Sequence, residues 1–109
     1  MGAMAVALGA FGAHGLKAIL TPELLDTYKT GILYHLIHSV VLLVLSVNQK
    51  YVLKIPYYFI LSGIILFSFS LYVYSITSIK VFAMITPIGG ICLLLGWLLI
   101  IVFLVRNKE

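Results

Sequence analysis

The chain has 109 residues, of which 63% are hydrophobic and only 9% are charged, with a formal net charge of +4. Soluble domains carry roughly 25% charged residues, so this composition excludes a soluble globular fold and requires that most of the surface face lipid. The seven basic residues stand singly at the ends of apolar runs. Membrane-flanking residues follow that pattern, which excludes a nucleic-acid-binding surface.

Four uncharged runs predict four membrane-spanning helices. A helix rises about 1.5 Å per residue, so about 20 residues cross the ~30 Å hydrocarbon layer. The predicted fold is all-α, an integral membrane four-helix antiparallel bundle that forms a single transmembrane domain over residues 1–109. The predicted spans cover residues 1–16, 28–48, 56–78 and 81–105.

The first span is short and rich in small residues. A signal peptide is the alternative, because Phe11-Gly12-Ala13 resembles a cleavage site, but no basic residue precedes the apolar stretch as a signal peptide requires. Ala5, Gly9 and Ala13 form a small-residue face that lets a neighbouring helix approach closely. The sequence therefore predicts a thin, closely packed helix, whose length also suits a start a few residues before Met1.

Prolines indicate where the later helices begin. Thr21-Pro22-Glu23 has the order of a helix start, which predicts an amphipathic segment over 22–29 that lies at the interface or runs into the second span. Pro56 opens the third span. Thr86-Pro87 repeats the signal inside the fourth run. Either a helix begins there and spans 87–105, with a dipping loop before it, or one kinked helix runs from residue 81.

The basic residues favour cytoplasmic termini. Four spans place both termini and the middle loop on one side of the membrane. That side holds four basic residues and the other side holds three, and the positive-inside rule assigns the richer side to the cytoplasm. The two sets are Lys50, Lys54, Arg106 and Lys108 against Lys17, Lys29 and Lys80.

Most of the polar positions lie in one half of the membrane. At helical rise they fall about 5–14 Å below one boundary. They are His14, His35, His38, Tyr72 and Ser75, together with Pro87, Gly89 and Gly90 at the start of the fourth span. Two stripes should point inward, because lipid offers polar groups no partner. The stripes comprise Tyr28, Gly31, His35 and His38 on the second span and Ser68, Tyr72 and Ser75 on the third.

Three interpretations of the histidines are open. His14, His35 and His38 could bind a metal ion or haem, but no carboxylate or cysteine lies at their depth. A proton relay would also need a buried acidic partner. The favoured interpretation is a hydrogen-bonded polar core without a cofactor, built from the three histidines with Tyr34, Tyr72, Ser68 and Ser75.

Glycines and the single tryptophan complete the expected packing positions. Trp97 follows Gly96 near the middle of its helix and should pack across the glycine of a neighbouring helix or subunit. The backbone positions expected at close helix contacts are Gly9, Gly12, Gly31, Pro87, Gly89, Gly90 and Gly96. No phosphate loop, nucleophile elbow or paired carboxylate is present in a span, which argues against an enzyme.

Four motifs together resemble the small membrane proteins catalogued as domain of unknown function 423, which include bacterial inner-membrane proteins and small eukaryotic relatives. They are residues 7–16 (ALGAFGAHGL), Tyr34-His35-x-x-His38, residues 67–72 (FSFSLY), and residues 86–90 (TPIGG) followed by Gly96-Trp97. The resemblance covers nearly the whole chain and implies the four-span fold but no activity. The chain differs from the family pattern at His35, where glutamine is common, and at Phe69, where glycine is usual.

The sequence favours a non-enzymatic structural or accessory protein of the bacterial inner membrane, with the mitochondrial inner membrane as the alternative. We expect it to self-associate through its glycine faces or to serve as a small subunit of a membrane complex. A second hypothesis is binding or transport of a small membrane-soluble ligand, metal or haem in a pocket lined by His14, His38, Tyr72 and Gly89. A third is a membrane enzyme with His14 or His38 as base.

Overall fold

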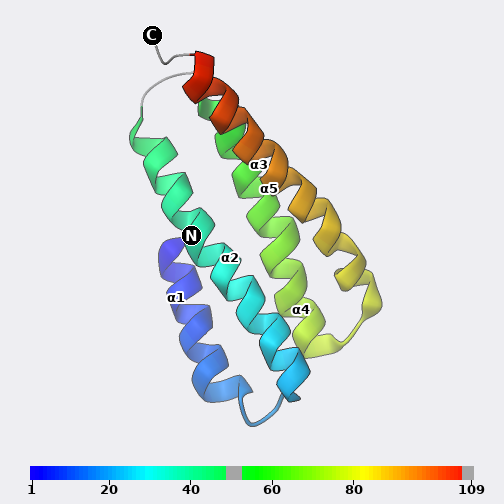
Figure 1. The fold of residues 1–109 in the computed structure, drawn as a ribbon. Helices are drawn as coiled ribbons and strands as arrows, with labels where there is room; N and C mark the ends of the chain where they lie inside the picture. Colours follow the sequence, from blue (N-terminus) through cyan, green and yellow to red (C-terminus); the bar gives the residue numbers. More distant parts are fainter. Residues whose placement is uncertain (49–52, 107–109) are drawn as a thin grey trace.

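The computed structural model of the chain describes residues 1–48 and 53–106, so Lys50 and Lys108 of the charge count lie outside the described residues. The described part is helical and contains no strand, which confirms the all-α antiparallel prediction (Figure 1). The elements are α1 (Gly2–Phe11), the π-helix η1 (Gly12–Leu16), α2 (Pro22–Val47), α3 (Lys54–Ile64), the π-helix η3 (Ile65–Phe69), α4 (Ser70–Thr77) and α5 (Lys80–Arg106).

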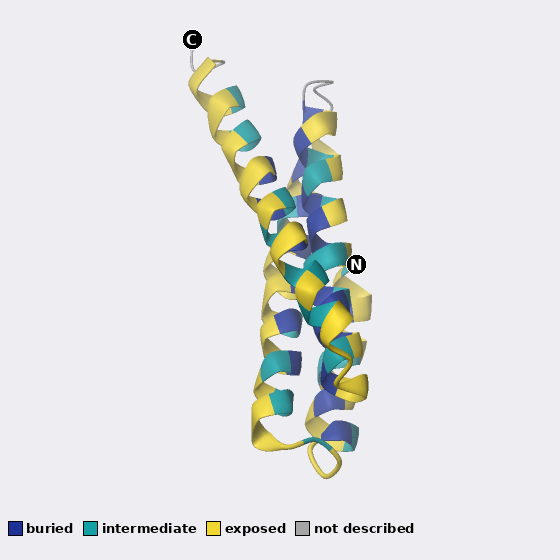
Figure 2. Ribbon diagram, turned by 90° about the vertical axis from the view of Figure 1, so that its right-hand side faces the viewer, coloured by how far each residue is buried: buried dark blue, intermediate teal, exposed yellow. Residues whose placement is uncertain are grey.

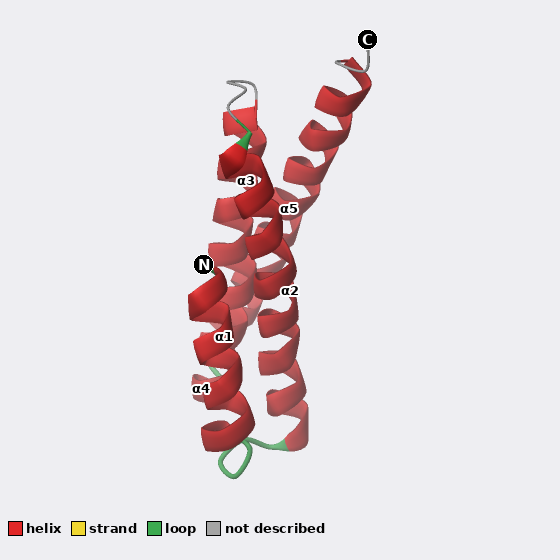
Figure 3. Ribbon diagram, turned by 90° about the vertical axis from the view of Figure 1, so that its left-hand side faces the viewer, coloured by secondary structure: helices red, strands yellow, loops and turns green. Residues whose placement is uncertain are grey.

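The helices form a flattened bundle of about 53 × 26 × 16 Å. α1 packs on α2, α2 packs on the continuous rod of α3, η3 and α4, and α5 packs on the other side of that rod. Seen from the side, the C-terminal part of α5 diverges from its neighbours (Figure 3). Three helical stretches are long and apolar enough to cross a membrane: Pro22–Val47, Lys54–Thr77 and Lys80–Arg106.

The first helical stretch, Gly2–Leu16, is shorter and covers only part of α2. Its beginning lies beside the middle of α2 (Figure 1). Residues 2–16 rise by only about half the length of α2, and the expectation that both termini lie on one side of the membrane stays a prediction.

The start signal at Thr21 is confirmed. Its hydroxyl accepts a hydrogen bond from the Leu24 N–H at 3.3 Å, and Pro22 occupies the first turn. α2 then runs without a break to Val47, so the amphipathic segment continues into the long helix.

α5 is one helix that contains Pro87, and a loop over residues 80–86 is not formed. Ser78 adopts a left-handed conformation with φ 58° at the end of α4, so the chain reverses there. Near Pro87, the Thr86 hydroxyl lies 3.3 Å from the Phe82 carbonyl and 2.6 Å from the Ser70 hydroxyl. These hydroxyl contacts are of the kind that lets membrane helices accommodate proline.

The two π-helices were not predicted and change which residues face inward. A π turn holds more residues than an α turn and shifts the phase of the side chains that follow. In the first helical stretch Ala5 and Gly12 are buried, whereas Ala13 is exposed. The small-residue face predicted at Ala5, Gly9 and Ala13 is therefore wrong at its last position, where Gly12 takes over.

Glycines bring the helices together within the chain. A Cβ at Gly96 would lie 2.7 Å from Ile60 Cδ1, one at Gly63 2.5 Å from Leu93 Cδ2, and one at Gly31 2.8 Å from Tyr72 Cε1. Gly31, Gly63 and Gly96 therefore pack against the chain's own helices, and self-association through glycine faces stays a prediction. Gly9 has ordinary contact with Ile32, and Gly90 lies 3.8 Å from the Phe67 ring.

Candidate functional site

His35 links α2 to α4 in the interior of the bundle. Its ring is fully buried, and its Nδ1 lies 2.9 Å from the Tyr72 hydroxyl, while its Nε2 lies 3.3 Å from the Met1 sulfur. A thioether can only accept a hydrogen bond. Nε2 therefore carries the proton and donates to Met1, and the Tyr72 hydroxyl donates to Nδ1.

His38 links α2 to α5 with the opposite arrangement. Its Nδ1 lies 2.7 Å from the Tyr34 carbonyl, which can only accept a hydrogen bond, and its Nε2 lies 3.0 Å from the Trp97 indole nitrogen. The indole N–H can only donate. The imidazole is therefore neutral with the proton on Nδ1, and a second proton on Nε2 would face the indole N–H. The sequence led us to expect Trp97 to pack on a glycine, and it gave no hydrogen-bond partner for the indole. An indole N–H in a membrane interior requires such a partner, which here is His38.

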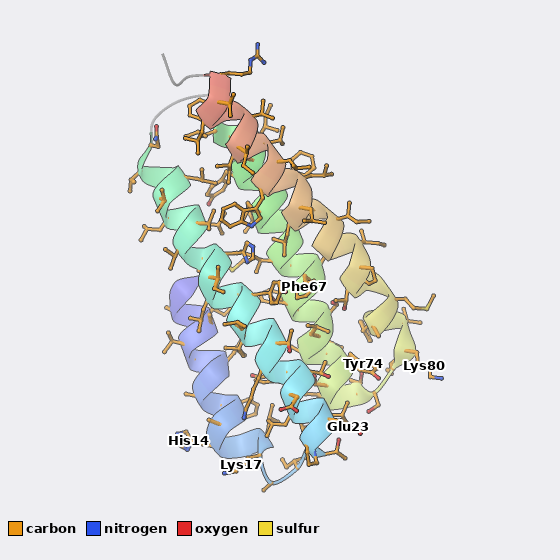
Figure 4. The ribbon with its side chains drawn as sticks, viewed as in Figure 1. His14, Lys17, Glu23, Phe67, Tyr74 and Lys80 are labelled. Atoms are coloured by element: carbon orange, nitrogen blue, oxygen red, sulfur yellow. The ribbon has the colours of Figure 1, made fainter. Side chains whose placement is uncertain are left out.

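His14 lies apart from the other two histidines. It is exposed on η1 and points away from the bundle near Lys17 (Figure 4). The π turn directs Gly12 and Leu16 toward the interior and leaves His14 outside. The predicted pocket of His14, His38, Tyr72 and Gly89 is therefore not assembled, because Tyr72 pairs with His35 and His38 pairs with Trp97.

The remaining polar candidates have different surroundings. The Ser75 hydroxyl donates to the Leu71 carbonyl at 2.7 Å. Ser68 is fully buried in η3, yet its hydroxyl has no hydrogen-bond partner within the described residues. Tyr34, expected in the core, is 38% exposed. The polar core is therefore a set of separate pairs rather than one connected network.

Tyr28 also belongs to the interior. Its hydroxyl donates to the Leu8 carbonyl at 2.6 Å, and its ring lies 5.1 Å from the Tyr72 ring. A Cβ at Gly12 would lie 2.8 Å from Tyr28 Cδ1. This hydrogen bond attaches the first helical stretch to α2. The sequence placed Tyr28 on the polar stripe but gave no signal for a backbone acceptor on another helix.

Metal binding receives no support from the described residues. No group of three His, Cys, Asp or Glu side chains there is placed to hold an ion. His38 lies three residues after His35 on α2, so their side chains point in directions about 60° apart around the helix axis. One ring consequently reaches α4 and the other reaches α5.

The two imidazoles should differ in their protonated nitrogen. In ¹⁵N NMR spectra of histidine-labelled protein in lipid nanodiscs, we expect a proton on Nε2 of His35 and on Nδ1 of His38. Trp97→Phe should shift the Nε2 resonance of His38 and leave His35 unchanged. Identical tautomers in the two rings would contradict these hydrogen-bond directions.

Residues 8–90 match the family described as "Protein of unknown function (DUF423)". The chain is 37% identical over 108 residues to the UPF0382 membrane protein YwdK of Bacillus subtilis, with 94% of this chain and 88% of YwdK covered. It is 36% identical over 108 residues to the UPF0382 inner membrane protein YgdD of Escherichia coli, covering 95% and 82% respectively. No solved structure shows significant similarity to the chain.

The chain therefore belongs to the DUF423 family, as the sequence motifs indicated. Its three long apolar helices and the names of these bacterial relatives identify it as a protein of the bacterial membrane. The molecular function of the family is unknown.

Proposed function

We propose that the chain is a structural or accessory membrane protein that crosses the membrane several times, self-associates and works without a metal or cofactor. The observation that carries this proposal is that both buried histidines spend both ring nitrogens on contacts within the chain. Each imidazole joins α2 to another helix, so the polar groups stabilise the bundle. Neither ring keeps a nitrogen for a substrate proton or a metal ion.

The surface of α5 supports self-association. Only Gly89, Leu93 and Gly96 are buried in this helix, and most of its length is coloured as exposed (Figure 2). Away from these residues, exposed branched side chains recur with alternating spacings of three and four, the repeat with which two helices pack along a common seam. They are Leu95, Leu98, Val102 and Val105. A second copy of α5 is the occupant that this repeat fits.

Cysteine cross-linking in the membrane tests the seam. Cys92 is the single cysteine, so Cys92→Ala provides a background in which one new cysteine reports one position. We expect Leu98→Cys to form a disulfide-linked dimer with an oxidant, and Val44→Cys, which is exposed on α2, to remain monomeric. Native mass spectrometry of the unmodified chain from nanodiscs should show an oligomer. A monomer there, with equal cross-linking of both variants, would refute self-association through α5.

A further inference from the structure

A groove opens between α2, η3 and α5 on the side of the His38–Trp97 pair. Its volume is about 490 Å³, and its lining includes Tyr34, His38, Phe67, Pro87, Leu94 and Trp97. No charged side chain contributes to the lining. The groove therefore suits a neutral guest of ring size or larger.

Four rings form a continuous wall of this groove. Phe67 lies 4.5 Å from Tyr34 between ring centroids, Tyr34 lies 6.0 Å from His38 with planes only 11° apart, and His38 meets Trp97 edge to face at 6.0 Å. Such separations are those of interacting aromatic pairs. A flat ring laid in the groove would extend this series, whereas a flexible acyl chain would leave the faces of the rings without a matching partner.

One polar group of the lining residues has no hydrogen-bond partner among the residues that the structure describes. His38 and Trp97 bond to each other, and the second His38 nitrogen is used by the Tyr34 carbonyl. The Tyr34 hydroxyl makes no hydrogen bond with any other described residue. Tyr34 is 38% exposed and follows Lys29, the last charged residue before the second span, by five positions, which is about 7.5 Å at helical rise. Hydrocarbon offers a hydroxyl no acceptor, and leaving it unpaired costs free energy. A guest with an oxygen acceptor would remove this cost.

We propose that the groove binds a neutral, planar, lipid-soluble ring that carries a carbonyl oxygen. The ring lies along the wall formed by Phe67, Tyr34, His38 and Trp97, and the carbonyl accepts a hydrogen bond from the Tyr34 hydroxyl. This site is independent of the proposed structural role, in which the Tyr34 side chain has no part. It also differs from the pocket expected from the sequence, which included His14 and Tyr72.

Trp97 reports on this site directly, because it lines the groove and is the only tryptophan in the chain. The probe is duroquinone, a methylated benzoquinone that quenches indole fluorescence. The chain is held in vesicles of ether-linked lipids, which bring no ester carbonyl and no tryptophan of their own. We expect quenching that saturates with duroquinone concentration. Quenching that rises linearly without saturation would mean that the probe only dissolves in the bilayer, and would overturn the proposal.

A matched pair of tyrosine variants tests the hydrogen bond. Tyr34→Phe keeps the ring and removes the hydroxyl, and should raise the half-saturating concentration about five-fold, the effect of one ordinary hydrogen bond. Tyr58→Phe alters an exposed tyrosine outside the groove and should change nothing. Circular dichroism verifies that both variants are folded. Equal half-saturation in Tyr34→Phe and the unmodified chain would overturn the assignment of the carbonyl to Tyr34.

The same question can be asked without a variant. Durene has the shape of duroquinone but no carbonyl. We expect durene to bind about five-fold more weakly than duroquinone. The concentration of durene that halves the quenching by duroquinone should therefore be about five-fold higher than expected for a competitor with the affinity of duroquinone. Equal competition by durene would leave no role for the carbonyl and would refute the proposed ligand class.

Discussion

Gly89→Ala is expected to destabilise the bundle by about 2 kcal/mol, although alanine favours a helix over glycine by up to about 1 kcal/mol. A Cβ at Gly89 would meet the backbone of η3, with the Leu66 carbonyl carbon at 2.6 Å and the Phe67 nitrogen also in its way. Backbone cannot move aside as a side chain can, so α5 must shift. Overpacking of this kind costs about 1–3 kcal/mol. The free energy of unfolding in bicelles, measured by steric trapping, gives the result.

Gly90 provides the control for this substitution. It is the next residue on the same helix, and a Cβ there would lie 3.8 Å from the Phe67 ring, an ordinary contact. Gly90→Ala should therefore leave the free energy of unfolding unchanged or raise it by up to about 1 kcal/mol. If both alanines had the same effect, the close approach of α5 to η3 would be wrong.

His35→Leu is expected to lower the free energy of unfolding by about 2 kcal/mol. The substitution removes the acceptor of the Tyr72 hydroxyl, which is buried between α2 and α4. A buried hydroxyl that loses its partner costs about 1–3 kcal/mol. His35→Gln should cost less than about 1 kcal/mol, because the amide oxygen can accept the same hydrogen bond. The same unfolding measurement in bicelles compares the two variants.

A double-mutant cycle separates this hydrogen bond from the packing of the ring. Tyr72→Phe removes the hydroxyl and keeps the ring packed against Tyr28. Adding Tyr72→Phe to His35→Leu should recover about 1 kcal/mol, since no unpaired hydroxyl remains. Strictly additive effects of the two changes would show that the hydrogen bond contributes nothing, and that His35 stabilises the bundle only through its volume.

The class of fold could be predicted because it rests on composition. Runs without charge leave no water-facing surface. In lipid the backbone groups of such a run must be hydrogen-bonded within the protein, and a helix does this within the run itself. The capping signal at Thr21 is local chemistry, so it could also be recognised. The inward direction of His35 and Ser75 followed from their position on a helical stripe. These features depend on residues close together in the sequence.

The partners of the polar groups could not be predicted in the same way. Two residues at a spacing of three, His35 and His38, share a stripe but diverge enough to reach different helices. The π-helices shift the phase of the side chains that follow them. η3 (ILFSF) contains no glycine or proline, and the glycines of η1 (GAHGL) also suit an ordinary close-packed helix, so neither sequence predicts the shift. One of them turns His14 outward. The exposed position of Tyr34 likewise depends on how α5 packs against η3, beside which α2 also lies.

The order of synthesis gives α2 a particular place in assembly. The partner of His35 lies 37 residues further along the chain, and the partner of His38 lies 59 residues further. When α1 and α2 emerge from the ribosome and enter the membrane, both imidazoles still lack these partners. Helices α4 and α5 then satisfy one ring each, in that order. The second half of the chain therefore supplies hydrogen-bond partners that the first half lacks. A chain that stops before α5 would keep the His38 Nδ1 contact with the Tyr34 carbonyl but leave His38 Nε2 without its indole donor.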